Sequence, residues 1–260
     1  MTLTWFKHIS YQIMAFLVSV AMIVGVAEYA ITKSYDSRKL HLPESFTITA
    51  HTGAFNTNQN SLEFIEAALK NNAGAIELDV RQRPDGTVVM AHDLVVTNRD
   101  GVELSKALKL LKGSDVKINF DIKETKALND LYKLIVNYGL IENAYMTGIE
   151  TKDIEAVKDS DCKNIPYYLN YSPSRIKIFE EEYRQKLLQL LADSGAVGIN
   201  CNFQYVGSSL CELLHNNGYK LSVWTIDTEL SAKKMLAVGP DNITTRDINM
   251  VQSVIDNWGK

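Results

Sequence analysis

The sequence predicts an α/β fold, a (β/α)8 barrel preceded by one apolar N-terminal helix. Three observations lead to this prediction. From residue 45 onward, eight short apolar or β-branched runs alternate with eight helical segments, as in a parallel sheet closed on itself. Acidic, basic and histidine side chains fall at the ends of these runs, where a barrel carries its chemistry. No glycine-rich phosphate turn follows the first run, which disfavours an open doubly wound sheet.

The composition is that of an ordinary globular protein. The chain has 260 residues, of which 46% are hydrophobic and 22% charged. A formal net charge of −4 argues against a nucleic-acid partner, which would usually meet a basic surface. Cys162, Cys201 and Cys211 are too scattered for a zinc ribbon or a disulfide framework. This length allows one sizeable domain or two small ones.

Residues 11–27 form an almost unbroken apolar run that is long enough to approach a membrane span. The run lacks the polar stripe of a soluble amphipathic helix. No clean Ala-x-Ala site follows it, because Glu28 and Tyr29 stand between the small residues, so we expect an uncleaved signal anchor rather than a cleaved signal peptide. We therefore divide the chain into a tail (1–10), a signal anchor or transmembrane helix (11–30), a polar tether (31–44) and the barrel (45–260).

The orientation in the membrane is set weakly by charge. Lys33, Arg38 and Lys39 follow the span and rival the N-terminal charge, so the positive-inside rule does not choose a side. A large domain after a short N-terminal tail is more usually translocated. We therefore expect a single-pass, membrane-anchored protein whose barrel lies on the extracytoplasmic side.

The expected strands are short runs rich in apolar and β-branched residues, at 46–50, 75–80, 116–122, 144–147, 165–169, 196–200, 219–225 and 242–245. The expected helices alternate with them, at 62–72, 104–111, 128–138, 152–159, 176–193, 208–216, 229–238 and 249–258. Asn60-Ser61 opens the first helix and Gly218 ends the sixth. Pro84-Asp85-Gly86 makes a turn after the second strand, and a short run at 88–91 then delivers His92.

Acidic residues at the strand ends indicate a metal site. Glu77, Asp79 and Arg81 alternate along the second strand and so point to one face. Together with Asp121 at the end of the third strand, Glu77 and Asp79 offer three hard oxygen ligands. Such ligands suit Mg²⁺ or Ca²⁺. A zinc site would require a histidine or cysteine ligand, and His51 and His92 could serve as such ligands.

Two histidines flank this site. His51 follows the first strand and His92 follows the turn, so the pair could divide acid and base work at a phosphodiester. Either histidine alone could equally be a cap or a turn residue. Lys123 faces the same way as Asp121 and could neutralise an anion. Trp224 and Asp227 end the seventh strand, and Arg246 and Asp247 end the eighth.

The motifs resemble those of the glycerophosphodiester phosphodiesterases, from residue 47 to the end and in that family's order. They are Ala50-His51-Thr52-Gly53, Asn60-Ser61-Leu62, Glu77-Leu78-Asp79-Val80, Pro84-Asp85-Gly86, Ala91-His92-Asp93, Asp121-Ile122-Lys123, Val223-Trp224-Thr225-Ile226-Asp227 and residues 239–245. The resemblance implies a TIM barrel that hydrolyses glycerophosphodiesters to glycerol 3-phosphate and an alcohol with a divalent cation. It also implies that Lys123 contacts the phosphate and that Trp224 lines the pocket. By the same match, the acid–base pair would be His51 and His92, and the metal ligands would be Glu77, Asp79 and Asp121.

The chain departs from that family's pattern at three places. Thr52 stands where the family has an arginine that grips phosphate, Gln59 replaces a carboxylate, and Asp121 is shorter than the usual glutamate. We hypothesise that Arg81 partly replaces the missing arginine. Asp-x-Lys also occurs in the related sphingomyelinase D-like phospholipases, so a phospholipase D-type lipid phosphodiesterase is one alternative. A catalytically weak barrel that binds phosphodiesters is another, because a fold alone does not decide function.

Overall fold

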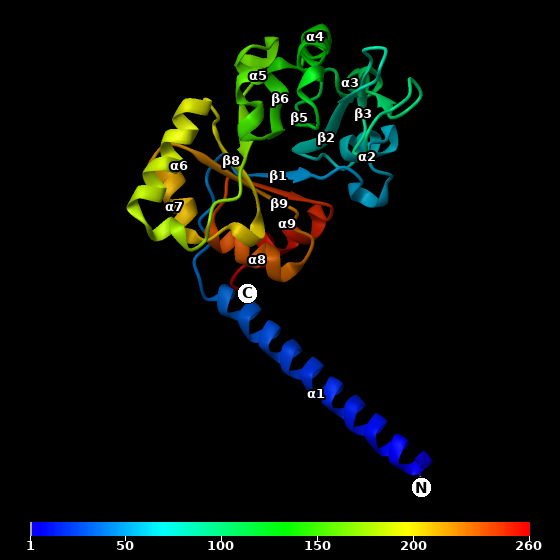
Figure 1. Ribbon diagram of the computed structural model, residues 1–260, viewed down its shortest axis with the longest axis vertical. Helices are drawn as coiled ribbons and strands as arrows, with labels where there is room; N and C mark the ends of the chain where they lie inside the picture. Colours follow the sequence, from blue (N-terminus) through cyan, green and yellow to red (C-terminus); the bar gives the residue numbers. More distant parts are fainter. Residues whose placement is uncertain (1) are drawn as a thin grey trace.

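Eight parallel strands close on themselves in the computed structural model, which describes residues 2–260 (Figure 1). β1 pairs with β2 on one side and with β10 on the other, which completes the ring and confirms the barrel. The strand bounds agree with the sequence prediction to within a few residues. The strands are β1 (Thr47–Ala50), β2 (Ala75–Gln82), β5 (Lys117–Ile122), β6 (Ala144–Ile149), β7 (Tyr167–Asn170), β8 (Gly198–Asn202), β9 (Lys220–Trp224) and β10 (Asn242–Thr245).

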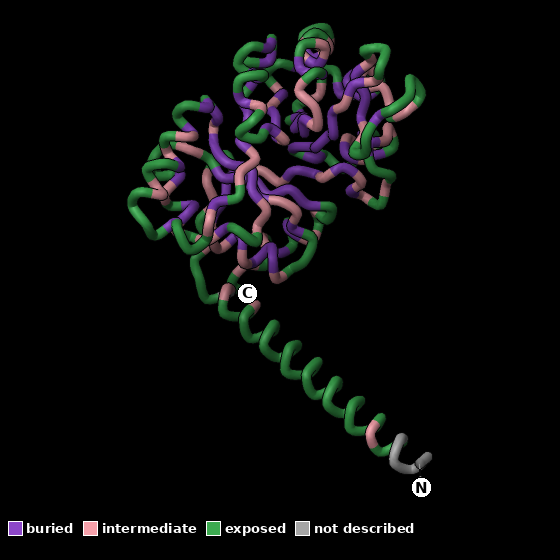
Figure 2. The backbone as a smooth tube through the Cα atoms, viewed as in Figure 1, coloured by how far each residue is buried: buried purple, intermediate pink, exposed green. Residues whose placement is uncertain are grey.

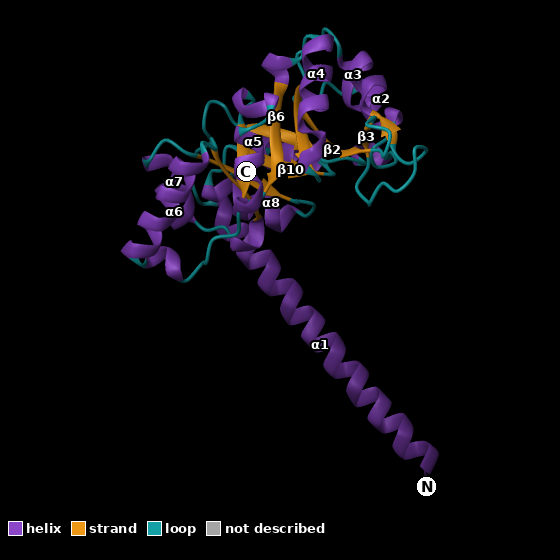
Figure 3. Cartoon of the chain, turned by 45° about the horizontal axis from the view of Figure 1, so that its top comes forward, coloured by secondary structure: helices purple, strands orange, loops and turns teal. Residues whose placement is uncertain are grey.

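Helices surround the strands on the outside (Figure 3). Along β2, Ile76 and Leu78 belong to the buried apolar core, while Glu77 and Asp79 alternate with them. Because successive side chains of a strand point to opposite faces, the acids face the barrel interior when the apolar residues face the helices. The helices are α2 (Leu62–Lys70), α3 (Leu104–Leu111), α4 (Leu128–Tyr138), α5 (Ile154–Lys158), α6 (Glu181–Ser194), α7 (Ser208–Asn216), α8 (Glu229–Val238) and α9 (Ile248–Asp256).

The expected helix at 176–193 is wrong in its first turn. A 3-10 turn ends at Phe179, and Glu180 adopts extended backbone angles before α6 begins. The break lets Ile178 reach the core while Ile176 and Phe179 stay exposed, so helical periodicity does not hold there.

The 3-10 turns are Ala54–Asn56, Thr125–Ala127, Ile141–Asn143, Thr151–Asp153, Asp161–Asn164, Lys177–Phe179 and Phe203–Tyr205.

The interior at the amino end of the barrel is polar. Asn242 Oδ1 accepts hydrogen bonds from Thr47 Oγ1 at 2.8 Å and Thr49 Oγ1 at 2.7 Å, and its Nδ2 donates to Ser222 at 3.0 Å. Buried polar groups are tolerated when they are paired in this way. The network ties β1, β9 and β10 together at this end of the barrel.

A hairpin extends the sheet beyond the barrel wall. β2 continues to Gln82 and pairs antiparallel with β3 (Val88–Met90), which pairs in turn with β4 (Val102–Glu103). The loop from 91 to 101 joins β3 to β4 and carries His92. The hairpin is therefore what brings this histidine to the rim.

The N-terminal helix α1 (Thr2–Asp36) projects away from the barrel and is exposed along most of its length (Figure 2). Its segment Lys7–Tyr35 has a mean hydropathy of 2.1 in its most apolar stretch, enough for a membrane span by length and composition. A signal sequence would have the same properties. The helix includes residues 31–36 of the expected tether, and Trp258 Nε1 donates to Arg38 O at 2.7 Å, so the following residues lie against the barrel.

Candidate active site

A cavity of ≈ 460 Å³ opens at the carboxyl ends of the strands. Every predicted site residue except Arg81 lines it. The cavity therefore joins residues that are far apart in the sequence, as barrel sites do. The predicted residues found there are His51, Glu77, Asp79, His92, Asp121, Lys123 and Trp224.

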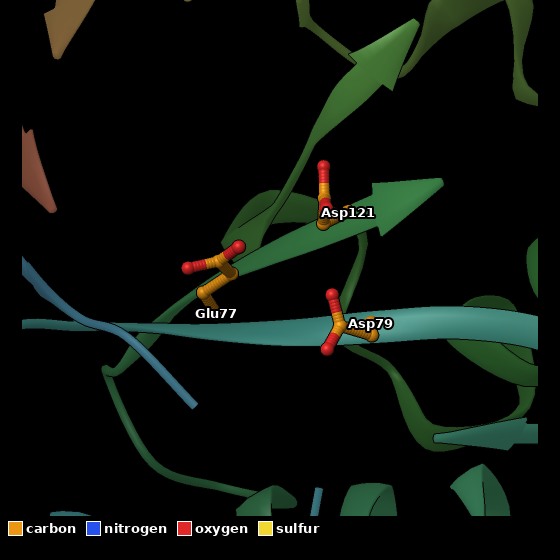
Figure 4. Close-up of side chains that lie close together, drawn as sticks. All are labelled: Glu77, Asp79 and Asp121. Carbon is orange, nitrogen blue, oxygen red and sulfur yellow. The ribbon is translucent and has the colours of Figure 1, made fainter. Parts of the chain in front are cut away.

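Three buried carboxylates converge in this cavity (Figure 4). Glu77 and Asp79 lie two residues apart on β2, and the strand register places Asp121 of β5 directly opposite Asp79. One oxygen atom from each acid lies within 4.8 Å of the others. Two like charges about 4 Å apart repel by roughly 4 kcal/mol at an effective dielectric constant of 20, so the cluster needs positive charge.

Lys123 supplies part of that charge. Its Nζ lies 2.8 Å from Asp79 Oδ1 and also contacts Asp121 Oδ2. Burial lowers the pKa of Lys123, but the two carboxylates outweigh burial and hold the pKa above its usual value. Burial likewise raises the pKa of Asp79, yet Lys123 and a hydrogen bond from Asn60 bring it below the ordinary range. Lys123 and Asp79 are therefore a charged pair.

Glu77 is the acid that remains unbalanced. Burial first, and then the charges of Asp121 and Asp79, raise the pKa of Glu77 well above its usual range. Its buried Oε2 accepts no hydrogen bond from residues 2–260. A buried acceptor without a partner costs free energy, which a bound cation would recover. The three carboxylates thus fit a hard divalent cation such as Mg²⁺ or Ca²⁺, whose binding would displace the proton from Glu77.

The ring of His51 is oriented by a backbone contact. Its Nδ1 lies 2.8 Å from Thr52 O, and since a carbonyl oxygen only accepts, Nδ1 carries the proton. The lone pair of the neutral ring is then on Nε2, which lies 3.8 Å from Glu77 Oε2. Burial is the largest cause that lowers the pKa of His51, and the positive charge of Arg246 acts in the same direction. Its imidazole is therefore held in the neutral form.

His92 lies at the mouth of the same cavity, with 63% of its side chain exposed. Its Nδ1 is 3.0 Å from Asp93 Oδ1, so this nitrogen carries a proton. The two histidines thus differ in environment: His51 is half-buried, and His92 is exposed beside a carboxylate.

Arg81 lies outside the group of residues that line the cavity. Its Nε donates to His92 O at 3.0 Å, and its Nη1 is 3.8 Å from Glu124 Oε2. The prediction extended the strand alternation to Arg81, but at Arg81 the strand β2 pairs with β3 beyond the barrel wall. The contacts of Arg81 give no support to its predicted role in phosphate binding; they hold the backbone that carries His92.

Sequence reasoning missed Asn60 as a site residue. Its Nδ2 donates to Asp79 Oδ2 at 2.7 Å, and its Oδ1 accepts from Asp79 N at 3.2 Å. Asn60 has a φ of 53°, a left-handed conformation that Asn adopts more readily than most residues. From the sequence, Asn60 was predicted only to open α2. An Asn directly before the N-cap Ser61 could have indicated the left-handed backbone conformation, because Asn adopts that conformation more readily than most residues.

Other polar side chains complete the cavity. Thr147 Oγ1 lies 2.9 Å from Asp121 Oδ1 and fixes the third acid. Gln59 lines the cavity and packs close to Gly53, where any Cβ would stand 2.8 Å from Gln59 Cγ. The buried Nε1 of Trp224 has no hydrogen-bond acceptor among residues 2–260. Arg246 also lines the cavity, a position that the sequence indicated only as a strand end.

The chain is similar in sequence to a glycerophosphodiester phosphodiesterase. A glycerophosphodiester phosphodiesterase of Caldanaerobacter subterraneus subsp. tengcongensis is 27% identical over 236 residues, which span 79% of this chain and 97% of that protein. No family model matches the chain. The motif resemblance seen in the sequence is confirmed by this relative.

Solved structures share the fold. A phosphodiesterase of Oleispira antarctica, in complex with its product sn-glycerol-3-phosphate, superposes with a TM-score of 0.66 at 17% identity, over 83% of this chain and 98% of its own. A glycerophosphodiester phosphodiesterase of Parabacteroides distasonis gives a TM-score of 0.65 at 17% identity, over 83% and 99%. The barrel is therefore the fold of these proteins over nearly their whole length.

The amide of Asn60 provides a test of how the acids are held. Replacing Asn60 with Gly keeps the left-handed backbone but removes both contacts to Asp79, so we expect Mg²⁺ affinity to fall about 10- to 100-fold, as for other partners of metal ligands. Isothermal titration calorimetry measures this affinity. Asn72→Gly is the matched control, since Asn72 is exposed and has a φ of 52°. Equal Mg²⁺ affinity in the two variants would show that Asn60 does not organise the carboxylates.

Proposed function

We propose that this chain is a phosphoric diester hydrolase that cleaves glycerophosphodiesters to glycerol 3-phosphate and an alcohol. The observation that carries the proposal is the convergence of three buried carboxylates, a half-buried histidine and a second, exposed histidine in one cavity at the carboxyl end of the barrel. The names of the similar proteins, and the sn-glycerol-3-phosphate bound to one of them, support the same substrate class.

In the proposed mechanism, Glu77, Asp79 and Asp121 would hold a divalent cation, Mg²⁺ or Ca²⁺. A bound cation would supply Lewis-acid stabilisation of negative charge on the phosphoryl group. Asn60 and Thr147 orient the carboxylates through their hydrogen bonds to Asp79 and Asp121. The protonated Lys123 adds a fixed positive charge beside the reacting group.

The two histidines transfer protons. His51 Nε2, the unprotonated nitrogen, takes a proton from the nucleophile, which is water or the substrate's own glycerol hydroxyl. The hydroxyl path first gives a cyclic phosphate, and attack of a water molecule on its phosphorus then breaks one ring P–O bond to give glycerol 3-phosphate. His92 donates a proton to the departing alcohol, a role that suits its exposed position and its partner Asp93. Trp224 forms part of the pocket wall. Each positioned acid or base contributes typically about 10² to 10⁴ in rate.

Replacing either histidine tests these roles. His51→Ala and His92→Ala should each lower the rate of glycerol 3-phosphate release from glycerophosphocholine by about 10² to 10⁴-fold, because a proton-transfer group is lost. The melting temperature should remain close to that of the parent chain. His41→Ala, which removes an exposed histidine outside the cavity, is the control. Activity retained in both site variants would refute the acid–base assignment.

The product also separates this function from a lipid phosphodiesterase. A D-type cleavage of sphingomyelin releases choline and leaves the phosphate on the lipid, so it yields no glycerol 3-phosphate. Release of choline from sphingomyelin, with none of glycerol 3-phosphate from glycerophosphocholine, would move the assignment to that class.

We further propose that α1 anchors the barrel to a membrane as a single-pass helix, with the barrel on the extracytoplasmic side. The exposed apolar segment Lys7–Tyr35 supports the anchor. In sealed right-side-out vesicles from expressing cells, added protease should degrade the barrel without detergent. A barrel that resists the protease until detergent is added would contradict this orientation, and a chain recovered in the soluble fraction without residues 1–30 would indicate a cleaved signal sequence.

A further inference from the structure

The charge balance of the cavity calls for one more cation. Lys123 is held between Asp79 and Asp121, so its charge is already opposed by carboxylates. Lys123 and one divalent cation would together only balance the three acids. A phosphodiester brings a further negative charge. In a pocket without surplus positive charge, electrostatic attraction contributes little to the binding of such an anion.

Arg246 is the other lysine or arginine among residues 2–260 that lines the cavity. It directly follows β10, so its backbone position is fixed by the end of a barrel strand. A guanidinium carries five N–H donors in a planar fork that matches two oxygen atoms of a phosphate group. The residue type and its place both suit an anionic ligand.

Asp227 holds Arg246 at two points. Asp227 Oδ1 accepts a hydrogen bond from the Arg246 backbone N–H at 2.8 Å, and Oδ2 accepts one from Nη1 at 2.9 Å. Within residues 2–260 the guanidinium makes no other hydrogen bond, so the Nε and Nη2 protons are left for a ligand. Asp227 does not line the cavity, and the ion pair is partly exposed, which weakens the opposing charge.

Thr52 and Arg81, the two other candidate positions for phosphate binding, make contacts outside the cavity. The Thr52 side chain is fully buried, and its Oγ1 accepts a hydrogen bond from Asn60 N at 2.6 Å, so it supports the loop before α2. Arg81 donates to His92 O and pairs with Glu124. Neither side chain lines the cavity, and Arg246 is the guanidinium that does.

We propose that Arg246 binds the non-bridging oxygens of the substrate phosphodiester and that Asp227 positions it for this contact. The inference rests on the proposed hydrolase function and names the residue that recognises the anion. It places the phosphate between the carboxylate cluster on β2 and β5 and the guanidinium beyond β10. Asp227 is a positioning residue, since it reaches the substrate only through Arg246.

Arg246→Ala should raise the KM for glycerophosphocholine and weaken binding of the product glycerol 3-phosphate, each by about 10- to 100-fold, the range expected for losing hydrogen bonds to a charged group. Because the contact exists before and during the reaction, kcat should fall much less than KM rises. Arg246→Lys should recover only part of the loss, since an ammonium has no planar fork. Asp227→Asn, which keeps an acceptor for the backbone N–H, should give an intermediate increase in KM.

The experiment uses the full chain with Mg²⁺, and calorimetry measures Mg²⁺ and glycerol 3-phosphate binding beside the kinetics. Mg²⁺ affinity should be unchanged in Arg246→Ala, which separates this role from that of the acids. Arg184→Ala, which removes a partly exposed arginine paired with Glu181 on α6 and outside the cavity, is the matched control. An active parent chain with unchanged KM and product affinity in both Arg246 variants would overturn the inference. A parent chain that neither hydrolyses the diester nor binds the product would instead overturn the proposed function.

Discussion

The register between β2 and β5 is the constraint on which the site depends. It sets Asp79 opposite Asp121 inside a closed barrel, with Glu77 one pleat away on the same face. Three carboxylates gathered in this way repel one another, so the interior must be organised around positive charge. Lys123 satisfies two of the acids, and the orphaned oxygen of Glu77 marks where the balance is incomplete. This geometry fits a divalent cation and is the basis for proposing one.

The surrounding structure fixes the reactive groups from several directions. The Asn60 amide binds both the side chain and the backbone of Asp79, and the Thr52 carbonyl sets the tautomer of His51. Arg81 holds the backbone of His92 from outside the cavity. These supports come from the loops after β1 and from the β2–β3 hairpin. The barrel strands therefore provide rigid positions for the carboxylates, while the loops bring the two histidines to the rim.

The sequence predicted the features that depend on local periodicity. Alternation along β2 put Glu77 and Asp79 on one face, and helix and strand patterns predicted the eightfold repeat. It could not predict contacts between distant segments. The pairing of Asp227 with Arg246 depends on the packing of two loops, and the partner of Asn60 depends on how the loop before α2 folds over β2. Arg81 follows the same alternation as the acids, but local pattern does not show where a strand leaves the barrel.

We propose that the carboxylate cluster holds a cation needed to hydrolyse glycerophosphodiesters. The most direct test measures glycerol 3-phosphate release from glycerophosphocholine by the full chain with Mg²⁺, with Ca²⁺ and after removal of cations with EDTA. We expect release with at least one of the two cations, loss of release in EDTA, and recovery when that cation is restored. Release that persists undiminished in EDTA, or no release from a folded chain that binds Mg²⁺ or Ca²⁺, would contradict the account.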